Sequence, residues 1–166
     1  MSHLKSKTAL VTGSTSGIGL AMAIGLAKQG VNIMVNGFGE KDAAIAAIKA
    51  CGVEVEYHGA DMSKPIEIED LIKQTEKRFG SLDILVNNAG IQHTANVEDF
   101  PEDKWESIIA INLSSAFYTS HHALPGMKKR NWGRIINIAS VHGLVGSAFC
   151  RAVTLVKPRM AWLGAT

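Results

Sequence analysis

Short apolar runs alternate with helix-favouring stretches over the first 138 residues, and this alternation restricts the fold more than any other feature. The apolar runs cover residues 9–11, 31–35, 53–57, 82–86 and 134–138. Helical patterns cover residues 20–30, 40–51, 65–79 and 101–127. Right-handed crossovers between such units produce a parallel sheet with helices on both faces. The sequence therefore predicts an α/β, doubly wound, Rossmann-type fold with the strand order 3-2-1-4-5.

Single residues mark the expected ends of two helices. Ser63 can cap the helix at residues 65–79, and Gly80 can end it. Pro125 is expected to bend or end the long helix at residues 101–127.

A glycine-rich turn, TGSTSGIG at residues 12–19, connects the first apolar run to the first helix. Such a turn brings bare backbone N–H groups and the positive end of a helix dipole together, which attracts phosphate. Gly13 can turn the chain at an unusual φ, Gly17 lets a pyrophosphate approach the backbone, and Gly19 allows close helix packing. The spacing departs from the Gly-x-Gly-x-x-Gly fingerprint. By itself the turn favours ligand binding, and the alternative is that it only connects the strand to the helix.

Composition limits the other functions open to the chain. Its 166 residues are 46% hydrophobic and 19% charged, with a net charge of +2, so nothing points to nucleic acid or to an anionic membrane. No apolar stretch is long enough for a membrane span, and we expect no signal peptide. Cys51 and Cys150 lack metal-ligand spacing and are interpreted as free thiols. We expect a cytoplasmic protein without a metal site, its domain at residues 1–148 and an aberrant tail at 149–166.

Polar residues follow several of the expected strands. In doubly wound sheets, ligands bind beyond the carboxyl ends of the strands, where the strand order reverses. The segments at that edge are the glycine turn and residues 36–38, 60–62, 87–93 and 139–143. The sequence therefore predicts a ligand site along this edge.

Five motifs in order resemble the short-chain dehydrogenase/reductase family. They are the glycine turn, Asp61, the NNAG at residues 87–90, Asn112 and Ser140. The resemblance covers about the first 148 residues.

Further segments, at residues 36–39, 90–93 and 140–145, resemble the bacterial D-3-hydroxybutyrate dehydrogenase subfamily. This resemblance implies an oxidoreductase that transfers a hydride between NAD and a small hydroxy or keto acid, 3-hydroxybutyrate or acetoacetate. It also implies homo-oligomers.

The family resemblance implies a cofactor site. Its residues would be Gly13, Thr15, Ser16, Gly17, Ile18, Gly19, Phe38, Asp61, Met62, Asn88, Ala89 and Gly90. The turn would hold the pyrophosphate, while Asp61 and Met62 would contact the adenine. As alternatives, Asp61 can make an Asx turn, and Asn87 and Asn88 can bond neighbouring backbone. No basic residue closely follows Asn36 to balance the 2′-phosphate of NADP, and no acidic residue stands there to bind the free 2′-hydroxyl of NAD. The choice of NAD therefore rests on the subfamily resemblance.

The resemblance also implies catalytic and substrate-binding residues. The catalytic residues would be Ser140, Asn112 and Lys157, and the substrate-binding residues Gln92, Ser140 and His142. The family uses a tyrosine as its acid and base, because a neighbouring lysine stabilises the phenolate. As alternatives, Asn112 can be a helix-packing amide, Ser140 a turn hydroxyl and His142 a surface residue.

The chain departs from the family after residue 148. The family places its tyrosine thirteen residues after the serine, and here that position holds Val153, although Lys157 matches the lysine. Valine has no ionisable proton, so we expect little or no turnover. We interpret the tail as a truncation or a change of reading frame, in which case Lys157 matches by coincidence. The alternatives are a catalytically dead NAD-binding or subunit-interaction module, and a truncated product without a role.

The same departure has a consequence for packing. In the family, the long helix with Trp105, Ile109 and Phe117 pairs with a further helix and with a sister subunit. We therefore expect an exposed apolar face on this helix and an open edge at the fifth strand.

Overall fold

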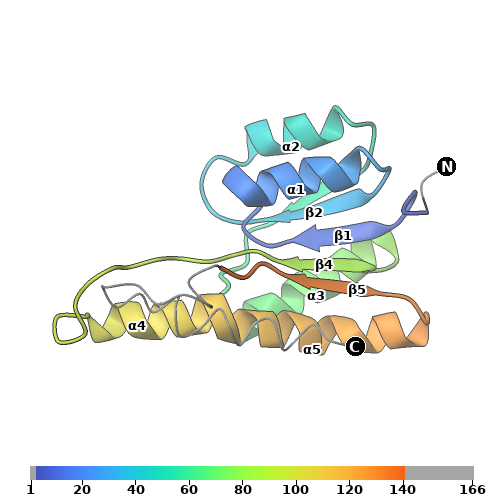
Figure 1. Cartoon of the computed structure of the whole chain (residues 1–166). Helices are drawn as coiled ribbons and strands as arrows, with labels where there is room; N and C mark the ends of the chain where they lie inside the picture. The colour runs from blue at the N-terminus through green and yellow to red at the C-terminus, as the bar shows by residue number, and fades with distance from the viewer. Residues whose placement is uncertain (1–2, 141–166) are drawn as a thin grey trace.

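The computed structural model describes residues 3–140, which form one parallel sheet with helices on both faces (Figure 1). The strand order is β3-β2-β1-β4-β5, so the predicted fold class and order are confirmed. The strands are β1 (Thr8–Val11), β2 (Asn32–Asn36), β3 (Val55–His58), β4 (Ile84–Asn87) and β5 (Arg134–Asn137). The order reverses between β1 and β4, which places the expected ligand edge beside the glycine turn.

The helices divide between the two faces of the sheet. They are α1 (Gly17–Ala27), α2 (Asp42–Lys49), α3 (Pro65–Phe79), α4 (Glu102–Ile109), the π-helical η1 (Ala110–Ser114) and α5 (Ser115–Lys129). In Figure 1, α1 and α2 lie on one side of the strands and α3 and α5 on the other.

Side chains of successive strand residues point to opposite faces and fill two cores. Ala9 and Val11 of β1 pack in the core under α1 and α2, whereas Leu10 packs in the core under α3 and α5. All three side chains are fully buried. Burial on both faces explains why the strands are continuous apolar runs in the sequence.

The entry to α3 differs from the prediction. Lys64 occupies the N-cap position and makes no side-chain cap hydrogen bond, so the prediction that Ser63 caps this helix is wrong. The Ser63 hydroxyl instead donates to Asp61 Oδ1 at 2.7 Å. The predicted end is confirmed, because Gly80 adopts a left-handed φ of 83°.

The expected long helix is interrupted by a π-helical turn and does not end at Pro125. Its first part is α4, η1 follows without a break, and α5 continues past Pro125 to Lys129. Ala123 and Met127, on either side of the proline, are buried in the core that α5 shares with α3. Burial of these side chains offsets the hydrogen bond that proline cannot donate.

Large apolar side chains are exposed on the long helix and on β5. Trp105 is 38% exposed, Phe117 51% and Ile136 44%, which confirms the expected exposure of Trp105 and Phe117. Within residues 3–140, β5 is the outermost strand on its side of the sheet. No helix in this part of the chain is both long and apolar enough to cross a membrane.

Candidate functional site

The three glycines of the turn have different structural roles. Gly13 has φ 63°, and a Cβ there would lie 3.0 Å from the Ala89 Cα. A Cβ on Gly19 would collide with the carbonyl oxygen of Gly13, so close helix packing requires glycine there. Gly17 has φ 54°, and no described atom lies within 4 Å of where its Cβ would be. The backbone at Gly17 is therefore open to an approaching ligand.

The N-terminus of α1 has no side-chain cap, as is also true of the other α-helices in the described part of the chain. Ser16 is the N-cap residue, with an extended backbone, and its hydroxyl makes no cap hydrogen bond within the described chain. The first helical bond runs from the Leu20 N–H to the Ser16 carbonyl at 3.1 Å. The preceding N–H groups of the first turn therefore fit a phosphate, which the helix dipole also attracts.

A loop that follows β2 lies against the turn. The Thr15 hydroxyl donates to the carbonyl oxygen of Phe38 at 2.8 Å. The side chain of Phe38 is 66% exposed and that of Ile18 70%. Two apolar side chains thus stand in solvent beside the open glycine turn, an arrangement that suits a flat aromatic ligand.

Asn88 joins the segment after β4 to the turn. Its side-chain Nδ2 donates to the carbonyl oxygens of Thr12 at 2.9 Å and Gly13 at 3.1 Å. In return, the Thr12 hydroxyl accepts the backbone N–H groups of Asn88 and Ala89, both at 3.0 Å. The side chain of Asn88 therefore has a structural role, one of the alternatives that the sequence left open.

Asn112 lies in the π-helical turn and holds the next part of the same segment. Its Oδ1 accepts the Ile91 N–H and its Nδ2 donates to the Ile91 carbonyl, both at 2.8 Å. The side chain is buried, with Asn112 only 1% exposed. Both ends of the amide are thus used to position Ile91, the residue next to Gln92.

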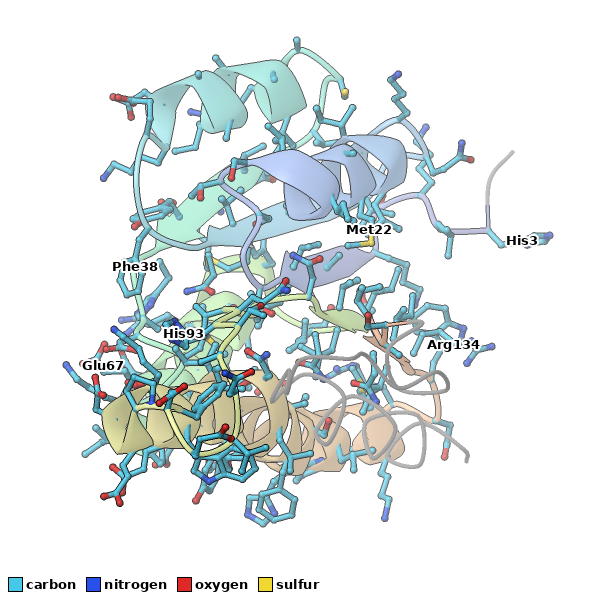
Figure 2. All side chains as sticks on the ribbon, turned by 60° about the vertical axis from the view of Figure 1, so that its left-hand side comes forward. His3, Met22, Phe38, Glu67, His93 and Arg134 are labelled. Carbon is cyan, nitrogen blue, oxygen red and sulfur yellow. The ribbon has the colours of Figure 1, made fainter. Side chains whose placement is uncertain are left out.

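These segments enclose a pocket of about 260 Å³ at the carboxyl ends of β4 and β5. Its lining residues are Ile18, Asn88, Gly90, Ile91, Gln92, Asn112, Ile138, Ala139 and Ser140. Figure 2 shows Phe38 and His93 on this side of the molecule, opposite His3 and Arg134. The structure thus brings together predicted cofactor, catalytic and substrate residues from four separate parts of the chain.

Asp61 and Met62 lie after β3 and are already engaged by the protein. Asp61 Oδ1 accepts the backbone N–H of Ser63 at 2.8 Å, the Asx turn that was the alternative to adenine binding. This bond is the main reason why the pKa of Asp61 is lowered, followed by the bond from the Ser63 hydroxyl. Asp61 Oδ2 lies 3.9 Å from Lys64 Nζ. Met62 is buried in the core, so any contact of Met62 with a cofactor would use its backbone.

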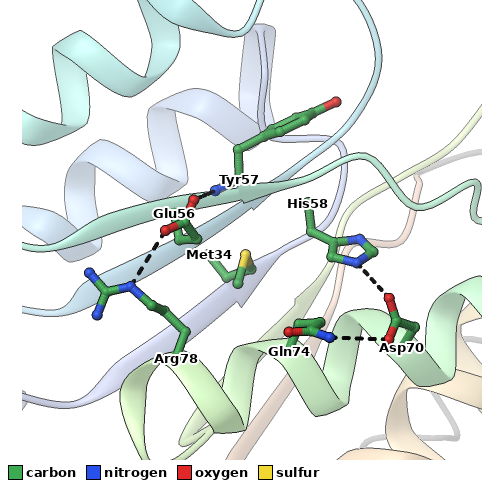
Figure 3. A pocket seen from close by; sticks show the side chains of 7 residues that line it. All are labelled: Met34, Glu56, Tyr57, His58, Asp70, Gln74 and Arg78. Atoms are coloured by element: carbon green, nitrogen blue, oxygen red, sulfur yellow. Dashed lines mark hydrogen bonds and ion pairs between the residues drawn. The ribbon is translucent and has the colours of Figure 1, made fainter.

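A second pocket, of about 340 Å³, lies between β3 and α3 (Figure 3). His58 Nε2 lies 3.0 Å from Asp70 Oδ2, and the bond from His58 is the main reason for the lowered pKa of Asp70. Gln74 Nε2 donates to Asp70 Oδ1 at 3.4 Å, and Arg78 Nε lies 3.4 Å from Glu56 Oε2. Most polar side chains of this pocket pair with one another, whereas the buried Nδ1 of His58 has no hydrogen-bond partner among the described residues. The pocket shares no lining residue with the pocket beside the glycine turn, so we assign it no part in the site.

Three positions from the sequence analysis lie outside the described residues. They are the predicted substrate-binding residue His142, the predicted catalytic residue Lys157, and Val153, which stands where the family has its tyrosine. The predicted domain boundary at residue 148 and the tail at 149–166 also fall outside.

Sequence reasoning missed several residues that shape this edge. It placed Asn36 after the apolar run at residues 31–35, whereas Asn36 is the buried last residue of β2. Its Nδ2 donates to the carbonyls of His58 and Ala60, both at 3.0 Å. It also gave no role to Ser14, whose hydroxyl donates to the Val11 carbonyl at 2.6 Å. For Asn36, a polar residue closing an otherwise apolar strand was the available signal.

The comparison with protein families agrees with this geometry. A family model described as short chain dehydrogenase matches residues 7–152. The chain belongs to the short-chain dehydrogenase family. The glycine turn, the NNAG segment and Ser140 lie at the edge where doubly wound folds bind their ligands.

Two curated short-chain dehydrogenases are similar to most of the chain. A D-beta-hydroxybutyrate dehydrogenase from Cupriavidus necator is 65% identical over 156 residues, which cover 93% of this chain and 60% of the relative. One from Rhizobium meliloti is 54% identical over 156 residues, with 92% and 60% covered. The chain thus spans 60% of the length of these relatives.

A solved structure of an NAD⁺-bound xylitol dehydrogenase also has the same fold. It matches with a TM-score of 0.89 at 30% identity, covering 97% of this chain and 63% of that chain.

Proposed function

We propose that the chain is the cofactor-binding part of an NAD-dependent oxidoreductase that interconverts 3-hydroxybutyrate and acetoacetate. The uncapped first turn of α1 beside the open backbone at Gly17 carries this proposal. The identity to two D-beta-hydroxybutyrate dehydrogenases and the NAD⁺ of the xylitol dehydrogenase support it. Bound NAD would supply the acceptor or donor of a hydride.

The chain's own residues would bind and orient the two ligands. The first-turn N–H groups, including that of Ile18, would hold the pyrophosphate, and the exposed Phe38 would cover the adenine. The Ser140 hydroxyl would donate a hydrogen bond to the substrate carbonyl or hydroxyl oxygen. The Gln92 amide would donate to the substrate carboxylate, with Asn112 holding the adjacent backbone through Ile91.

The proposed chemistry also needs a side chain that carries a proton to or from the substrate oxygen. A phenol becomes an effective base near neutral pH only when a nearby cation stabilises its phenolate. Val153 stands at the family's tyrosine position. We therefore propose that this chain binds NAD but turns over little or no substrate.

Two measurements on the same preparation test the proposal. Calorimetry with NAD should give saturable binding, which Gly17→Val should abolish by filling the open space at the turn. An absorbance assay for NADH with 3-hydroxybutyrate should show turnover reduced by roughly 10²-fold or more, the usual contribution of a general acid and base. Absence of NAD binding would refute the function, and turnover typical of a complete family enzyme would refute the inactivity.

A subunit-interaction module is the second candidate, and one observation favours it. Phe117 is 51% exposed on α5, and Trp105 is 38% exposed on α4 of the same long helix. Homo-oligomerisation through this helix and a cytoplasmic location remain proposals. NAD binding without turnover, together with self-association, would favour the module over a working enzyme.

A further inference from the structure

A chain of side-chain hydrogen bonds crosses from α5 through β4 to β5. The Thr119 hydroxyl lies 2.7 Å from Asn87 Oδ1, and Asn87 Nδ2 donates to Asn137 Oδ1 at 2.9 Å. Thr119 is 0% exposed and Asn87 4%. Three elements are therefore joined by polar side chains, of which Thr119 and Asn87 are buried and Asn137 is half-buried.

The orientation of the Asn87 amide sets the direction of this chain, because Oδ1 faces Thr119 and Nδ2 faces Asn137. Amide and backbone oxygens can only accept, and a hydroxyl has a single proton to donate. The Thr119 oxygen also lies 2.9 Å from the Ser115 carbonyl oxygen. If the proton pointed there, two oxygen lone pairs would face each other at 2.7 Å between Thr119 and Asn87. With this amide orientation the hydroxyl therefore donates to Asn87, and the opposite end of the amide donates to Asn137.

The Asn87–Asn137 bond lies directly beneath the candidate site. The two residues are partners in the parallel register of β4 and β5. The residues that directly follow the two strands, Asn88 after β4 and Ile138 after β5, line the 260 Å³ pocket. The Ile138 N–H donates to the Asn87 carbonyl at 2.9 Å. Thr119 is thus linked through hydrogen bonds to Asn87 and Asn137, the last strand residues before the two segments that line the pocket.

We infer that Thr119 is a positioning residue: through Asn87 and Asn137 it sets the separation between the segment carrying Asn88 and that carrying Ser140. Thr119 does not line the pocket, so it acts through the two asparagines. The inference rests on the proposed function only in taking those segments as the walls of the NAD and substrate site.

Matched variants of the whole chain separate positioning from general stability. Thr119→Val keeps the shape and removes the hydroxyl, which leaves Asn87 Oδ1 without its donor. Thr75→Val on α3 is the control, because Thr75 is also 0% exposed and its hydroxyl donates to the Leu71 carbonyl of its own helix at 2.7 Å. Thr119→Ser retains the hydroxyl and serves as the rescue variant.

The first readout is native-state hydrogen exchange and needs no ligand. The Ile138 amide reports on the β4–β5 junction, and the Ile33 amide, bonded to the Glu54 carbonyl at 2.9 Å, reports on the opposite side of the sheet. Thr119→Val should speed exchange at Ile138 about tenfold relative to Ile33. A tenfold change corresponds to ~1.4 kcal/mol, which lies within the cost of leaving a buried acceptor unpaired. Thr75→Val and Thr119→Ser should leave this ratio unchanged.

Equal acceleration at both amides in Thr119→Val would overturn the inference, since it would show only a loss of global stability. The same loss of protection in Thr119→Ser would also overturn it, by assigning the effect to the methyl group. If Thr119→Val does not fold, an unchanged ratio in Thr119→Ser supports the inference.

The second readout is the dissociation constant for NAD by calorimetry. It should rise about three- to tenfold in Thr119→Val, a part of the cost of the unpaired acceptor, and stay unchanged in Thr75→Val. An unchanged constant in Thr119→Val would overturn the inference. If the unsubstituted chain does not bind NAD, the proposed function fails, and the exchange ratio alone then decides the role of Thr119.

Discussion

At the scale of single residues, α1 contains two glycines with opposite structural roles. Gly19 is buried against the turn, where a Cβ would collide with the Gly13 carbonyl. Gly25 is exposed in the same helix, and a Cβ there would meet no described atom within 4 Å. One glycine is therefore required by packing, whereas the other only lowers helix propensity.

We predict opposite effects of alanine at these two positions. Gly19→Ala should lower the free energy of unfolding by ~3 kcal/mol or more, because the helix must move away from the strand. Gly25→Ala should raise it by ~0.5–1 kcal/mol, because alanine favours the helix. Urea unfolding followed by circular dichroism measures both. A stable Gly19→Ala protein that still binds NAD would contradict the packing role of Gly19.

At the scale of elements, the π-helical turn in the long helix carries a polar side chain that is buried. Asn112 is buried and pairs with both backbone groups of Ile91, 21 residues away in the sequence. Because π-helical turns are often found at functional sites, this one explains how a helix can hold the segment that leads to Gln92.

We predict that Asn112→Asp destabilises the protein in a pH-dependent way. The substitution keeps the acceptor for the Ile91 N–H but places a carboxylate against the Ile91 carbonyl, at a cost of ~2 kcal/mol or more near pH 7. Burial raises the pKa of the introduced carboxyl. Its protonated form can donate to Ile91, so the loss relative to the unsubstituted chain should shrink as the pH falls.

Urea midpoints of both proteins between pH 7 and pH 5 measure this difference. A difference that stays constant over this range would show that the donor to Ile91 is unimportant.

At the scale of the whole molecule, apolar side chains are exposed on the long helix. Phe117 stacks on His121, with ring centroids 5.8 Å apart and an interplanar angle of 22°. Trp105 is partly covered by the edge of Phe100, at a centroid distance of 6.4 Å. Exposed large apolar side chains on one helix favour association between molecules.

We predict concentration-dependent self-association that Phe117→Lys weakens. The introduced charge would have to be desolvated in any contact over this helix. Sedimentation velocity should show a shift toward the monomer in Phe117→Lys. Ile66→Lys is the matched control, because Ile66 is 77% exposed in the first turn of α3 and should leave the association unchanged. A monomer at every concentration before substitution would contradict the prediction.

The sequence by itself determined the fold and the edge of the sheet where the candidate site lies. Apolar runs and helical periodicity are local properties, so the five strands, their order and the edge beside the glycine turn could all be predicted. The same holds for Gly13 and Gly80, because a left-handed φ of 63° or 83° is a local requirement. The course of the long helix at Pro125 could not be predicted in this way. It depends on the burial of Ala123 and Met127 against other elements, which keeps α5 helical past the proline.

Only the tertiary structure decided which polar side chains at the edge are used within the protein. Asp61 and Asn88 were candidate ligand contacts in the sequence, and the fold gives both of them internal partners. Thr119 and Asn137 attracted no attention, because their common partner Asn87 lies 32 and 50 residues away. A buried polar group must find a hydrogen-bond partner, and nothing local to the chain shows which distant residue will supply it.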